Sequence, residues 1–482
     1  MYDVTIIGAG VVGTAIAREL AKYDLKTVLV DKENDVSNGT TKANSAIVHA
    51  GFDCKPNTEK AKMNVRGNEM YEQMCKDLDV PFKKIGSFVV AFDEDDLTTL
   101  DKLKKQGEIN GVPGLKILSK EEVEKREPNL SKDVIGALYA PSAGIVGSYE
   151  LAIALAENAA DNGVNILLNS PVTNIDKTAE GFQITAGKET LVSHFVINCA
   201  GVYADKINNF VNKPTFEILP FIGEYNLFDK STGDFLNTIV FQAPSSKGKG
   251  VVSLPTVEGN FLIGPTSEGP KQPNDLKTSR NGLQELREKG AKVVPNFPFH
   301  KVITSFAGLR AKVAHNDFII EESETANFIN VAAIDSPGLT AAPAIAEKVM
   351  EMLKDKLVDL QANMTFVPTR RPVTRFMESS NEMKAELIGK DHRYGRVICR
   401  CENITEAEIV DMIHRHAGAT TVDGVKRRIR AGAGRCQGGF CAPRVMEILA
   451  RERNVDVLSI VKDKQDSYIL TGETKATTVE FV

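Results

Sequence analysis

The sequence predicts an α/β protein with several domains, and three observations support this fold class. At 482 residues, the chain is longer than a single hydrophobic core usually organises. It opens with a strand, a glycine-rich turn, a helix and a second strand, the pattern of a parallel βαβ unit. Near its end stand four closely spaced cysteines, Cys399, Cys401, Cys436 and Cys441. We therefore expect a discontinuous Rossmann-like domain, an inserted α+β antiparallel-sheet domain and a small C-terminal four-cysteine domain.

The opening unit carries a dinucleotide-binding signature. Its expected elements are a buried strand at 4–7, a helix at 13–22 and a second strand at 27–30. Between strand and helix, Gly8, Gly10 and Gly13 permit a tight turn, close approach of a pyrophosphate and close packing of the helix. The positive end of the helix then faces the phosphates. Asp31 ends the second strand, where a carboxylate accepts a ribose hydroxyl. This pattern alone does not separate FAD from NAD.

The middle of the chain alternates between helical and strand-like patterns. The charged segment 93–127 is expected to be helical and exposed, and the turn-rich segment 140–147 leads back to the core. The expected elements after it are a helix at 149–162 and a strand at 165–168. From 216 to 264, apolar residues alternate with polar ones between turns, which indicates an antiparallel sheet with strands at 239–241, 251–254 and 261–263.

The chain then returns to the first domain. A strand at 328–333, a turn at 335–338 and a long helix to about residue 353 are expected, and residues 355–390 have the weak periodicity of a linker. The predicted domains are 1–85, 145–215 and 300–355 for dinucleotide binding, 86–144 and 216–299 for the substrate, 356–393 as linker, 394–455 for the cysteines and 456–482 as tail.

Composition limits the class of partner. Lysine and arginine number 59 against 64 acids, a net charge of −5, which provides no electrostatic footprint for nucleic acid. No apolar run is long enough for a membrane span, so membrane association is expected only through a partner. Seven cysteines, an odd number, appear without a secretory signal, which favours a reducing compartment. We expect a cytoplasmic protein.

Three later segments favour FAD. The segments 194–205 (HFVINCAGVYAD), 306–310 (FAGLR) and 335–345 (DSPGLTAAPAI) resemble the D-amino-acid-oxidase-like superfamily of flavoproteins. The resemblance implies FAD and places a helix N-terminus beside the pyrimidine edge of the flavin, where its positive end stabilises the reduced ring. The FAD contacts implied by these segments are Ala200, Gly201, Gly308, Gly338, Leu339 and Thr340.

The segment 44–51 (NSAIVHAG) supplies the first catalytic candidate. The resemblance implies that this segment passes the isoalloxazine ring, with Ser45 among the cofactor contacts. Removing hydride from a secondary alcohol also requires that the hydroxyl proton leave, and His49 could accept it as a base. His49 could equally contact flavin or substrate, or pack against backbone. His315 is a second candidate.

Arg310 is the second catalytic candidate. A guanidinium beside the flavin would clamp a carboxylate or phosphate with two hydrogen bonds and orient the C–H bond. A buried salt bridge is the alternative. Glu224 and Tyr225 are expected on the sheet that faces the flavin, or as sheet residues without a chemical role.

The four C-terminal cysteines predict a metal centre. Thiolates bind iron-sulfur clusters, although four of them also suit zinc. The C-x-C and C-x4-C spacing resembles the [2Fe-2S] domain of bacterioferritin-associated ferredoxin, which implies that all four cysteines bind the cluster. Nearby cations could stabilise the added electron, dock an acidic partner or simply be solvated; they are Lys426, Arg427, Arg428, Arg430 and Arg435. The remaining cysteines, Cys54, Cys75 and Cys199, are expected to pack, with a redox or contact role open for Cys54.

The whole architecture resembles the large subunit of anaerobic glycerol-3-phosphate dehydrogenases, whereas the flavin body is also similar to L-2-hydroxyglutarate dehydrogenases. Asp53 stands where the former carry an arginine for phosphate, and an acid there would repel phosphate unless it points away. We expect a dehydrogenase of the glycerol-3-phosphate type that oxidises a small anionic CH–OH substrate and passes electrons through the cluster to a redox partner subunit or acceptor protein. The alternatives are a 2-hydroxy-acid dehydrogenase, an amino-acid or amine dehydrogenase, and an electron-transfer subunit without its own substrate.

Overall fold

The computed structural model describes residues 1–244, 250–357 and 360–473. The chain forms two compact units. The first comprises Met1–Lys32 and Val36–Pro372, and the second comprises Glu33–Asp35 and Val373–Val482. In the part of the chain that is described, no helix is long and apolar enough to cross a membrane.

A parallel sheet organises the first unit. Its parallel strands, in spatial order, are β19 (Phe328–Ala332), β12 (Glu189–Asn198), β1 (Tyr2–Ile7), β2 (Thr27–Val30) and β9 (Asn165–Leu167). Residues 28–30 and 329 are fully buried, as expected for strands that are covered on both faces. The predicted βαβ unit at the start of the chain is confirmed.

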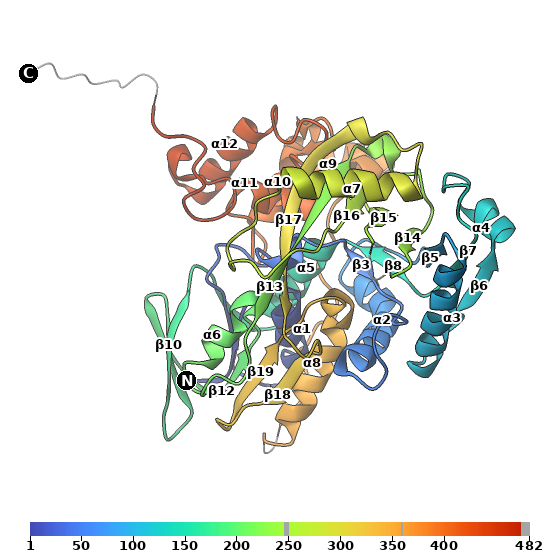
Figure 1. The fold of residues 1–482 in the computed structure, drawn as a ribbon. Coiled ribbons are helices and arrows are strands. Elements are labelled where there is room, and N and C mark those ends of the chain that lie inside the picture. The colour runs from blue at the N-terminus through green and yellow to red at the C-terminus, as the bar shows by residue number, and fades with distance from the viewer. Residues whose placement is uncertain (245–249, 358–359, 474–482) are drawn as a thin grey trace, which may run out of the picture. The chain divides into compact units, whose positions relative to one another are not determined.

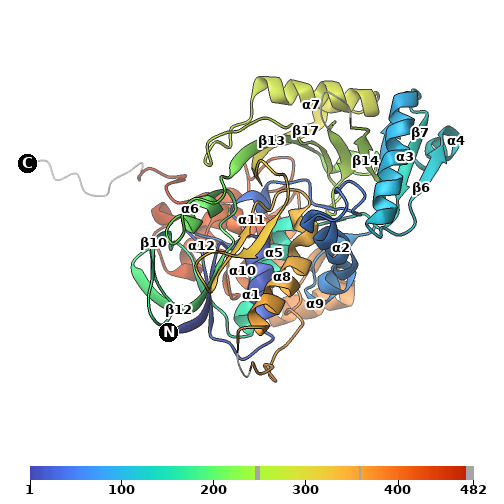
Figure 2. The same cartoon turned by 60° about the horizontal axis from the view of Figure 1, so that its bottom comes forward.

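Four helices pack beside this sheet (Figures 1 and 2). They are α1 (Val11–Leu20), α2 (Glu59–Asp77), α5 (Ser148–Asp161) and α8 (Gly338–Lys354). Helix α1 contacts both α5 and α8, and α2 lies along α8. The α2 and α8 backbones come close at Gly67, where a Cβ atom would lie 2.0 Å from the carbonyl oxygen of Thr340. Glycine at that position is therefore required by packing.

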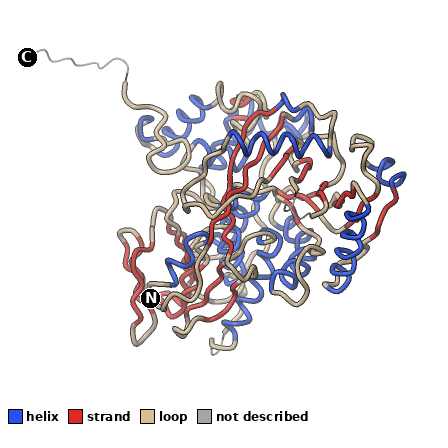
Figure 3. Tube along the Cα trace, viewed as in Figure 1, coloured by secondary structure: helices blue, strands red, loops and turns tan. Residues whose placement is uncertain are grey.

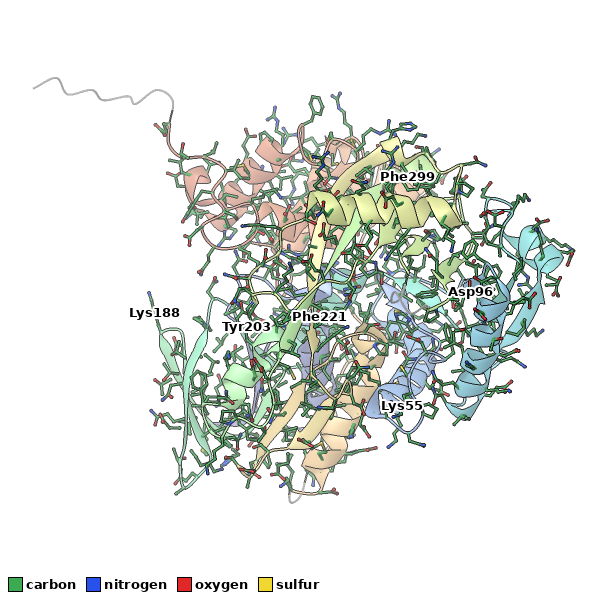
Figure 4. The ribbon with its side chains drawn as sticks, viewed as in Figure 1. Lys55, Asp96, Lys188, Tyr203, Phe221 and Phe299 are labelled. Carbon is green, nitrogen blue, oxygen red and sulfur yellow. The ribbon has the colours of Figure 1, made fainter. Side chains whose placement is uncertain are left out.

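Antiparallel strands extend the sheet on the side of β12 that is away from β1, whereas β9 ends the other side. The antiparallel strands are β10 (Val172–Lys177) and β11 (Phe182–Ala186) beside the first half of β12, and β18 (Ile319–Glu322) beside β19. Lys188 in the turn after β11 and Asp96 on α3 (Glu94–Ile109) lie at opposite ends of the first unit (Figure 4). Short connecting helices are η1 (Thr40–Lys42), η2 (Gly201–Tyr203), α6 (Ala204–Asn208), η3 (Lys230–Thr232) and η4 (Phe299–Lys301).

A second sheet of eight strands forms the other half of the first unit. Its order is β17 (Val302–Lys312), β13 (Leu219–Phe228), β16 (Phe261–Gly264), β15 (Val252–Pro255), β14 (Ile239–Gln242), β5 (Ser87–Ala91), β7 (Gly136–Ala140) and β6 (Lys116–Ser119). The long strands β13 and β17 run side by side (Figure 3). The predicted antiparallel sheet is confirmed, except that β14 and β5 pair in parallel.

Helices border this sheet. They are α7 (Arg280–Val293) against β13, α3 (Glu94–Ile109) against β5 and β7, and α4 (Lys120–Arg126) against β6 and β7. The segment 93–127, predicted to be helical, thus contains the helices α3 and α4, but the prediction is wrong for the strand β6 between them. Leu118 is the one buried residue of this edge strand, so it lacks the apolar run that identifies a central strand. A third, small sheet joins β3 (Ile47–Val48), β8 (Gly144–Val146) and β4 (Phe82–Lys83).

The second unit is mostly helical. Its elements are η5 (Phe376–Glu378), α9 (Asn381–Lys390), η6 (His392–Gly395), β20 (Val397–Cys399), β21 (Ile404–Thr405), α10 (Glu406–Ile413), α11 (Val422–Ile429), α12 (Ala442–Arg453) and η7 (Val457–Ser459). Helix α9 lies within the stretch predicted as a linker. Thr405 and Glu408 form a capping box that starts α10, and Ile409, Val425 and Leu449 are fully buried in the core of this unit.

Candidate functional site

The first glycine turn is closely packed. Gly8 has φ of +110°, and a Cβ atom there would lie 2.3 Å from the carbonyl oxygen of Cys199. A Cβ atom on Gly13 would lie 1.9 Å from the carbonyl oxygen of Gly8. A larger residue in place of Gly8 would push the turn away from β12, and one in place of Gly13 would push α1 away from β1. Gly10 is less confined, since its Cβ atom would meet the Thr41 hydroxyl at 3.2 Å.

Asp31 braces this turn. Its Oδ2 atom accepts a hydrogen bond of 2.6 Å from the backbone N–H of Ala9. Beside it, the N–H of Cys199 donates to the carbonyl of Ile7, so Ala200 and Gly201 follow β12 at the same edge of the sheet. The structure thus brings the predicted dinucleotide residues together at the carboxyl ends of parallel strands, where α/β proteins bind nucleotides. The ring of Tyr203 lies under the Lys32 ammonium at 3.8 Å, and Figure 4 labels it.

Two helices, α2 and α8, fix the backbone of His49. Its N–H donates to the Thr340 hydroxyl at 2.9 Å, and its carbonyl accepts from Asn64 and Asn68 of α2. Its imidazole lies 5.9 Å from the ring of Phe241 on β14, measured between centroids. His49 therefore lies where α2, the first turn of α8 and the second sheet approach one another. Ser45 comes shortly before it, next to β3.

The first turn of α8 is held against this segment. The Tyr71 hydroxyl donates to the carbonyl of Leu339, and Gly338 begins the helix after the turn at Asp335. The first N–H groups of a helix have no acceptor inside it, so this turn presents donors and the positive end of the helix dipole. These properties suit the electron-rich pyrimidine edge of a flavin.

The register of β13 and β17 decides which side chains share a face. Phe221, Gly223 and Tyr225 are paired with Arg310, Gly308 and Phe306. Residues directly opposite one another point to the same side of a sheet, so these six form one face. At its edge, a Cβ atom on Gly308 would lie 1.9 Å from the carbonyl of Ala43, which brings the chain before His49 against β17.

Arg310 is oriented on this face by polar neighbours. Its Nη2 atom donates to the carbonyl of Thr266 at 3.1 Å, and its guanidinium also bonds the Tyr225 hydroxyl. A Cβ atom on Gly223 would lie 2.6 Å from Nη2, so glycine leaves the space that the guanidinium fills. Burial raises the pKa of Tyr225 while Arg310 opposes the rise, and the phenol stays protonated near neutral pH. The guanidinium of Arg310 is therefore directed at a backbone carbonyl and a phenol, and its charge also acts on the buried carboxylate of Asp335.

Glu224 points to the opposite side of the sheet. Its carboxylate accepts from the N–H of Ser279 at 2.7 Å and from the Ser279 hydroxyl at 2.8 Å, just before α7. Glu224 lies on the expected sheet but on the face opposite Tyr225, because successive strand residues alternate between faces, so of the two expectations the structure favours a sheet residue for Glu224. Its role is to fasten α7 to the sheet.

Positive charge collects where β17 ends and α8 begins. Lys60 forms an ion pair of 2.5 Å with Asp335, and both side chains are largely buried. Burial raises the pKa of Asp335, while Lys60, Lys312 and Arg310 oppose that rise. Three cations, Lys60, Lys312 and Arg310, thus act on this one carboxylate.

Two further predicted residues lie at the surface. His315 is exposed in the turn between β17 and β18, and Asp53 is exposed in the turn after Gly51. An exposed carboxylate is screened by water, so Asp53 does not oppose phosphate as a buried acid would. Cys75 and Cys199 are buried, and burial raises the pKa of Cys75 to about 12, as expected for packing residues.

In the second unit, the four predicted ligands form two pairs. The Sγ atoms of Cys401 and Cys436 are 3.6 Å apart, and the thiols of Cys399 and Cys441 are hydrogen bonded. No three His, Cys, Asp or Glu side chains of the described residues converge on one point as a single metal ion would require. Two thiol pairs suit a cluster of two irons, each of which takes two cysteines.

Backbone amides point at these sulfur atoms. The Cys441 thiol and the N–H groups of Gly432, Glu402 and Cys401 lower the pKa of Cys399 to about 6, against the effect of burial. Burial tends to raise the pKa of Cys436. Hydrogen bonds from the N–H groups of Phe440 and Gly438 help to lower it below its usual value. Amide donors around cysteine sulfur stabilise thiolates and the iron-sulfur clusters that they bind.

The nearby cations divide into two groups. Arg427 and Arg428 are buried and bind Asp35, and Arg430 binds Glu402 at 2.9 Å. Their charges are neutralised within the unit, so a solvated or docking role is wrong for these three. Arg435 is exposed, and Lys426 is half-buried beside Asp423.

Three contacts of the site were not predicted from the sequence. They are the packing of Phe241 on the ring of His49, the hydrogen bond between Thr340 and His49, and the ion pair between Lys60 and Asp335. Lys60 and Asp335 come from elements far apart in the chain, and no local pattern connects them. A charged residue on the buried face of α2 was the available signal, since a buried lysine needs a partner.

Comparisons with known proteins agree with this geometry. The family model described as FAD dependent oxidoreductase matches residues 3–352, and the model described as BFD-like [2Fe-2S] binding domain matches residues 397–451. The chain is 54% identical over 477 residues to glycerol 3-phosphate dehydrogenase of Caloramator mitchellensis, and the match covers 99% of each chain.

A solved structure is also similar to the first unit. Dithionite-reduced L-alpha-glycerophosphate oxidase from Mycoplasma pneumoniae with FAD bound has a TM-score of 0.73 and 32% identity, over 77% of this chain and 98% of that one. Mitochondrial L-2-hydroxyglutarate dehydrogenase of Homo sapiens is 29% identical over 284 residues, which covers 55% of this chain and 61% of that protein. The matches confirm the expected cofactors, FAD and a [2Fe-2S] cluster, whereas the roles of individual site residues stay predictions.

Proposed function

Because the chain belongs to the family of FAD dependent oxidoreductases and carries a BFD-like [2Fe-2S] binding domain, we propose that it oxidises glycerol 3-phosphate at its secondary alcohol. The observation that carries this choice is the identity of 54%, over 99% of both chains, with a glycerol 3-phosphate dehydrogenase. The oriented guanidinium of Arg310 supports it, since the substrate is a phosphate ester.

Arg310 is proposed to bind the anionic group. Its guanidinium is already oriented by Thr266 and Tyr225, so little side-chain freedom is lost when a phosphate binds. The exposed position of Asp53 is compatible with this role. Phe221 and Tyr225 on the same face would exclude water from the carbon skeleton.

His49 is proposed to accept the hydroxyl proton. Its backbone is fixed on both sides, by Thr340 and by two asparagines, and its imidazole lies 5.9 Å from the ring of Phe241, measured between centroids. An imidazole titrates near neutral pH and can take a proton as the C–H bond breaks. When bound, FAD accepts the hydride, and the cluster carries its electrons onward one at a time.

The dinucleotide end is proposed to hold the cofactor. Gly8, Gly10 and Gly13 would face the pyrophosphate, and Asp31 would bind the ribose. Ala200 and Gly201, which follow β12 at the same edge of the sheet, would also contact the cofactor. The segment at Ser45 and the first turn of α8, with Gly338, Leu339 and Thr340, would contact the flavin ring, with Gly308 giving close backbone approach.

The protein is proposed to act in the cytoplasm with a separate protein as electron acceptor. None of its seven cysteines, all within the described residues, forms a disulfide, which suits a reducing compartment.

Anaerobic reduction of the bound flavin tests the substrate. Holoprotein is mixed with glycerol 3-phosphate, L-2-hydroxyglutarate, L-lactate, proline or sarcosine, and the oxidised flavin absorbance is followed. We expect rapid bleaching by glycerol 3-phosphate alone. Bleaching by L-2-hydroxyglutarate or an amine instead would reassign the substrate, and no bleaching by any donor would favour an electron-transfer subunit.

A further inference from the structure

A row of polar residues runs along one side of helix α2. Lys60, Asn64 and Asn68 are spaced four residues apart, so they share one side of the helix. The two asparagines donate to the carbonyl of His49, whose own N–H donates to Thr340 in the first turn of α8. This side of α2 is therefore bonded to a segment that is itself bonded to the start of α8.

Lys60 ends this row with a buried ion pair. Its ammonium lies 2.5 Å from the carboxylate of Asp335, and the two side chains are 10% and 6% exposed. The ammonium also donates to the amide oxygen of Asn316 at 3.2 Å and lies 5.5 Å from the centre of the Phe318 ring. The backbone N–H of Lys60 donates to Asp317 at 3.0 Å, so the residue is held at both ends.

Asp335 lies next to the positive end of α8. Its carbonyl accepts a hydrogen bond from the N–H of Gly338, the first residue of that helix. A carboxylate at this place opposes the positive end of the helix dipole. Without a counterion, it would disfavour the negative charge that a flavin gains on reduction. Lys60 makes the ion pair with this carboxylate, and Lys312 and Arg310 also act on it.

We propose that Lys60 raises the reduction potential of the bound flavin by neutralising Asp335, so that the positive end of α8 can stabilise the reduced ring. Lys60 acts through Asp335 and is a positioning residue. The inference rests on the proposed contact between the flavin and the first turn of α8. It requires neither side chain to touch the cofactor, because at an effective dielectric constant of about 20 a buried unit charge about 12 Å away changes an equilibrium constant about tenfold.

Two opposite substitutions test this role. The flavin potential is measured by dithionite titration of the holoprotein against a reference dye, at about pH 8, which lies between the usual pKa values of a carboxyl and a lysine, about 3.9 and 10.4. We expect Lys60→Met to disfavour flavin reduction about tenfold, a fall of about 30 mV for a two-electron couple. Asp335→Asn leaves the lysine charge without its counterion and should favour reduction by a similar factor. The double variant should return to within about threefold of the original equilibrium, because its two charge changes cancel.

Lys348→Met is the matched control. Lys348 forms an ion pair of 2.5 Å with Glu59, so this pair also joins α8 to α2. It lies ten residues beyond Gly338, about 15 Å along the helix axis. Its two side chains are 27% and 26% exposed, so water and salt screen its charge. We expect the flavin reduction equilibrium of this variant to change by less than about twofold.

The sign of the shift separates this role from a structural one. Each single variant leaves a buried charge unpaired and should unfold at a lower temperature, so a purely structural pair would move the potential in the same direction in both. Shifts of the same sign, unchanged potentials in both variants, or an equal shift in Lys348→Met would each overturn the proposal.

A second variant covers loss of the cofactor. If Lys60→Met does not retain FAD, Lys60→Gln takes its place, since an amide can still donate a hydrogen bond to Asp335 without carrying the charge. The potentials are measured without substrate. Failure of the flavin bleaching test together with opposite shifts in the two variants would therefore reject only the proposed substrate.

Discussion

Arg310 is positioned before any substrate arrives. The carbonyl of Thr266 and the hydroxyl of Tyr225 hold its guanidinium over Gly223. This arrangement uses the planar, forked geometry of arginine, which a lysine ammonium cannot reproduce. Unlike an exposed lysine or arginine, Arg310 therefore has its guanidinium held in a fixed orientation by neighbouring groups.

Arg310→Lys tests the anion clamp. Because charge is kept and the two-pronged hydrogen bond is lost, we expect kcat/KM for glycerol 3-phosphate to fall about 10- to 100-fold, equivalent to the roughly 1.5–3 kcal/mol of a charged hydrogen bond. Most of the loss should appear in KM. Lys188→Met, at an exposed hairpin turn, is the control. An unchanged KM in Arg310→Lys would contradict the clamp.

His49→Asn tests the proposed base. Loss of a general base should lower the rate of flavin reduction about 10²- to 10⁴-fold and remove the acidic limb of its pH profile. The measurement is anaerobic stopped-flow reduction across pH, with FAD content as the check on folding. A variant that keeps the pH profile but shifts the flavin potential would show instead that His49 only contacts the ring.

At the scale of elements, close backbone packing shapes the dinucleotide turn. Gly13→Ala places a methyl group where only 1.9 Å separates it from the carbonyl oxygen of Gly8. We expect purified Gly13→Ala to lose most of its FAD and to unfold at lower temperature, by about 1–3 kcal/mol of stability, as overpacked sites do. Gly389→Ala, in open space on α9, is the matched control and should retain its FAD. Full FAD content in Gly13→Ala would contradict the packing argument.

The second unit depends on a buried ion network. Burial disfavours the Asp35 carboxylate, but Arg428 and Arg427 outweigh it and lower its pKa below the usual value. A lowered carboxyl pKa contributes stability that is present above the unfolded pKa of about 3.9 and is lost as pH falls below it.

Asp35→Asn should therefore destabilise this unit by about 3–5 kcal/mol, because buried Arg428 loses its carboxylate and buried Arg427 keeps only Asp463. The loss should be the same at about pH 5 and about pH 7, since both lie above the unfolded carboxyl pKa of about 3.9. The measurement is thermal loss of the visible cluster absorbance at each pH. A loss of stability in Asp35→Asn that differs strongly between these two pH values would contradict the lowered pKa of Asp35.

Sequence patterns predicted the elements whose signals are local. The glycine turn, the strands at 4–7 and 27–30, the helix after Asp335 and the cysteine spacing follow from neighbouring residues. The face that Glu224 occupies depends on the register of β13 with β17, and the burial of Arg427 and Arg428 depends on Asp35, some 390 positions away. Such partners are not visible in a single sequence.

At the scale of the whole molecule, the chain combines two kinds of redox group. A flavin takes two electrons from a donor as hydride, whereas an iron-sulfur cluster transfers one at a time. The family matches cover both groups, at residues 3–352 and 397–451. We propose that electrons from glycerol 3-phosphate enter at the flavin and leave through the cluster.

Rapid freeze-quench electron paramagnetic resonance of the anaerobic holoprotein tests this claim most directly. After mixing with glycerol 3-phosphate, we expect flavin bleaching first and then the signal of the reduced [2Fe-2S] cluster. In Cys401→Ser, flavin bleaching should persist while that cluster signal is lost. A cluster that dithionite reduces but that stays oxidised while the substrate fully reduces the flavin would contradict the account.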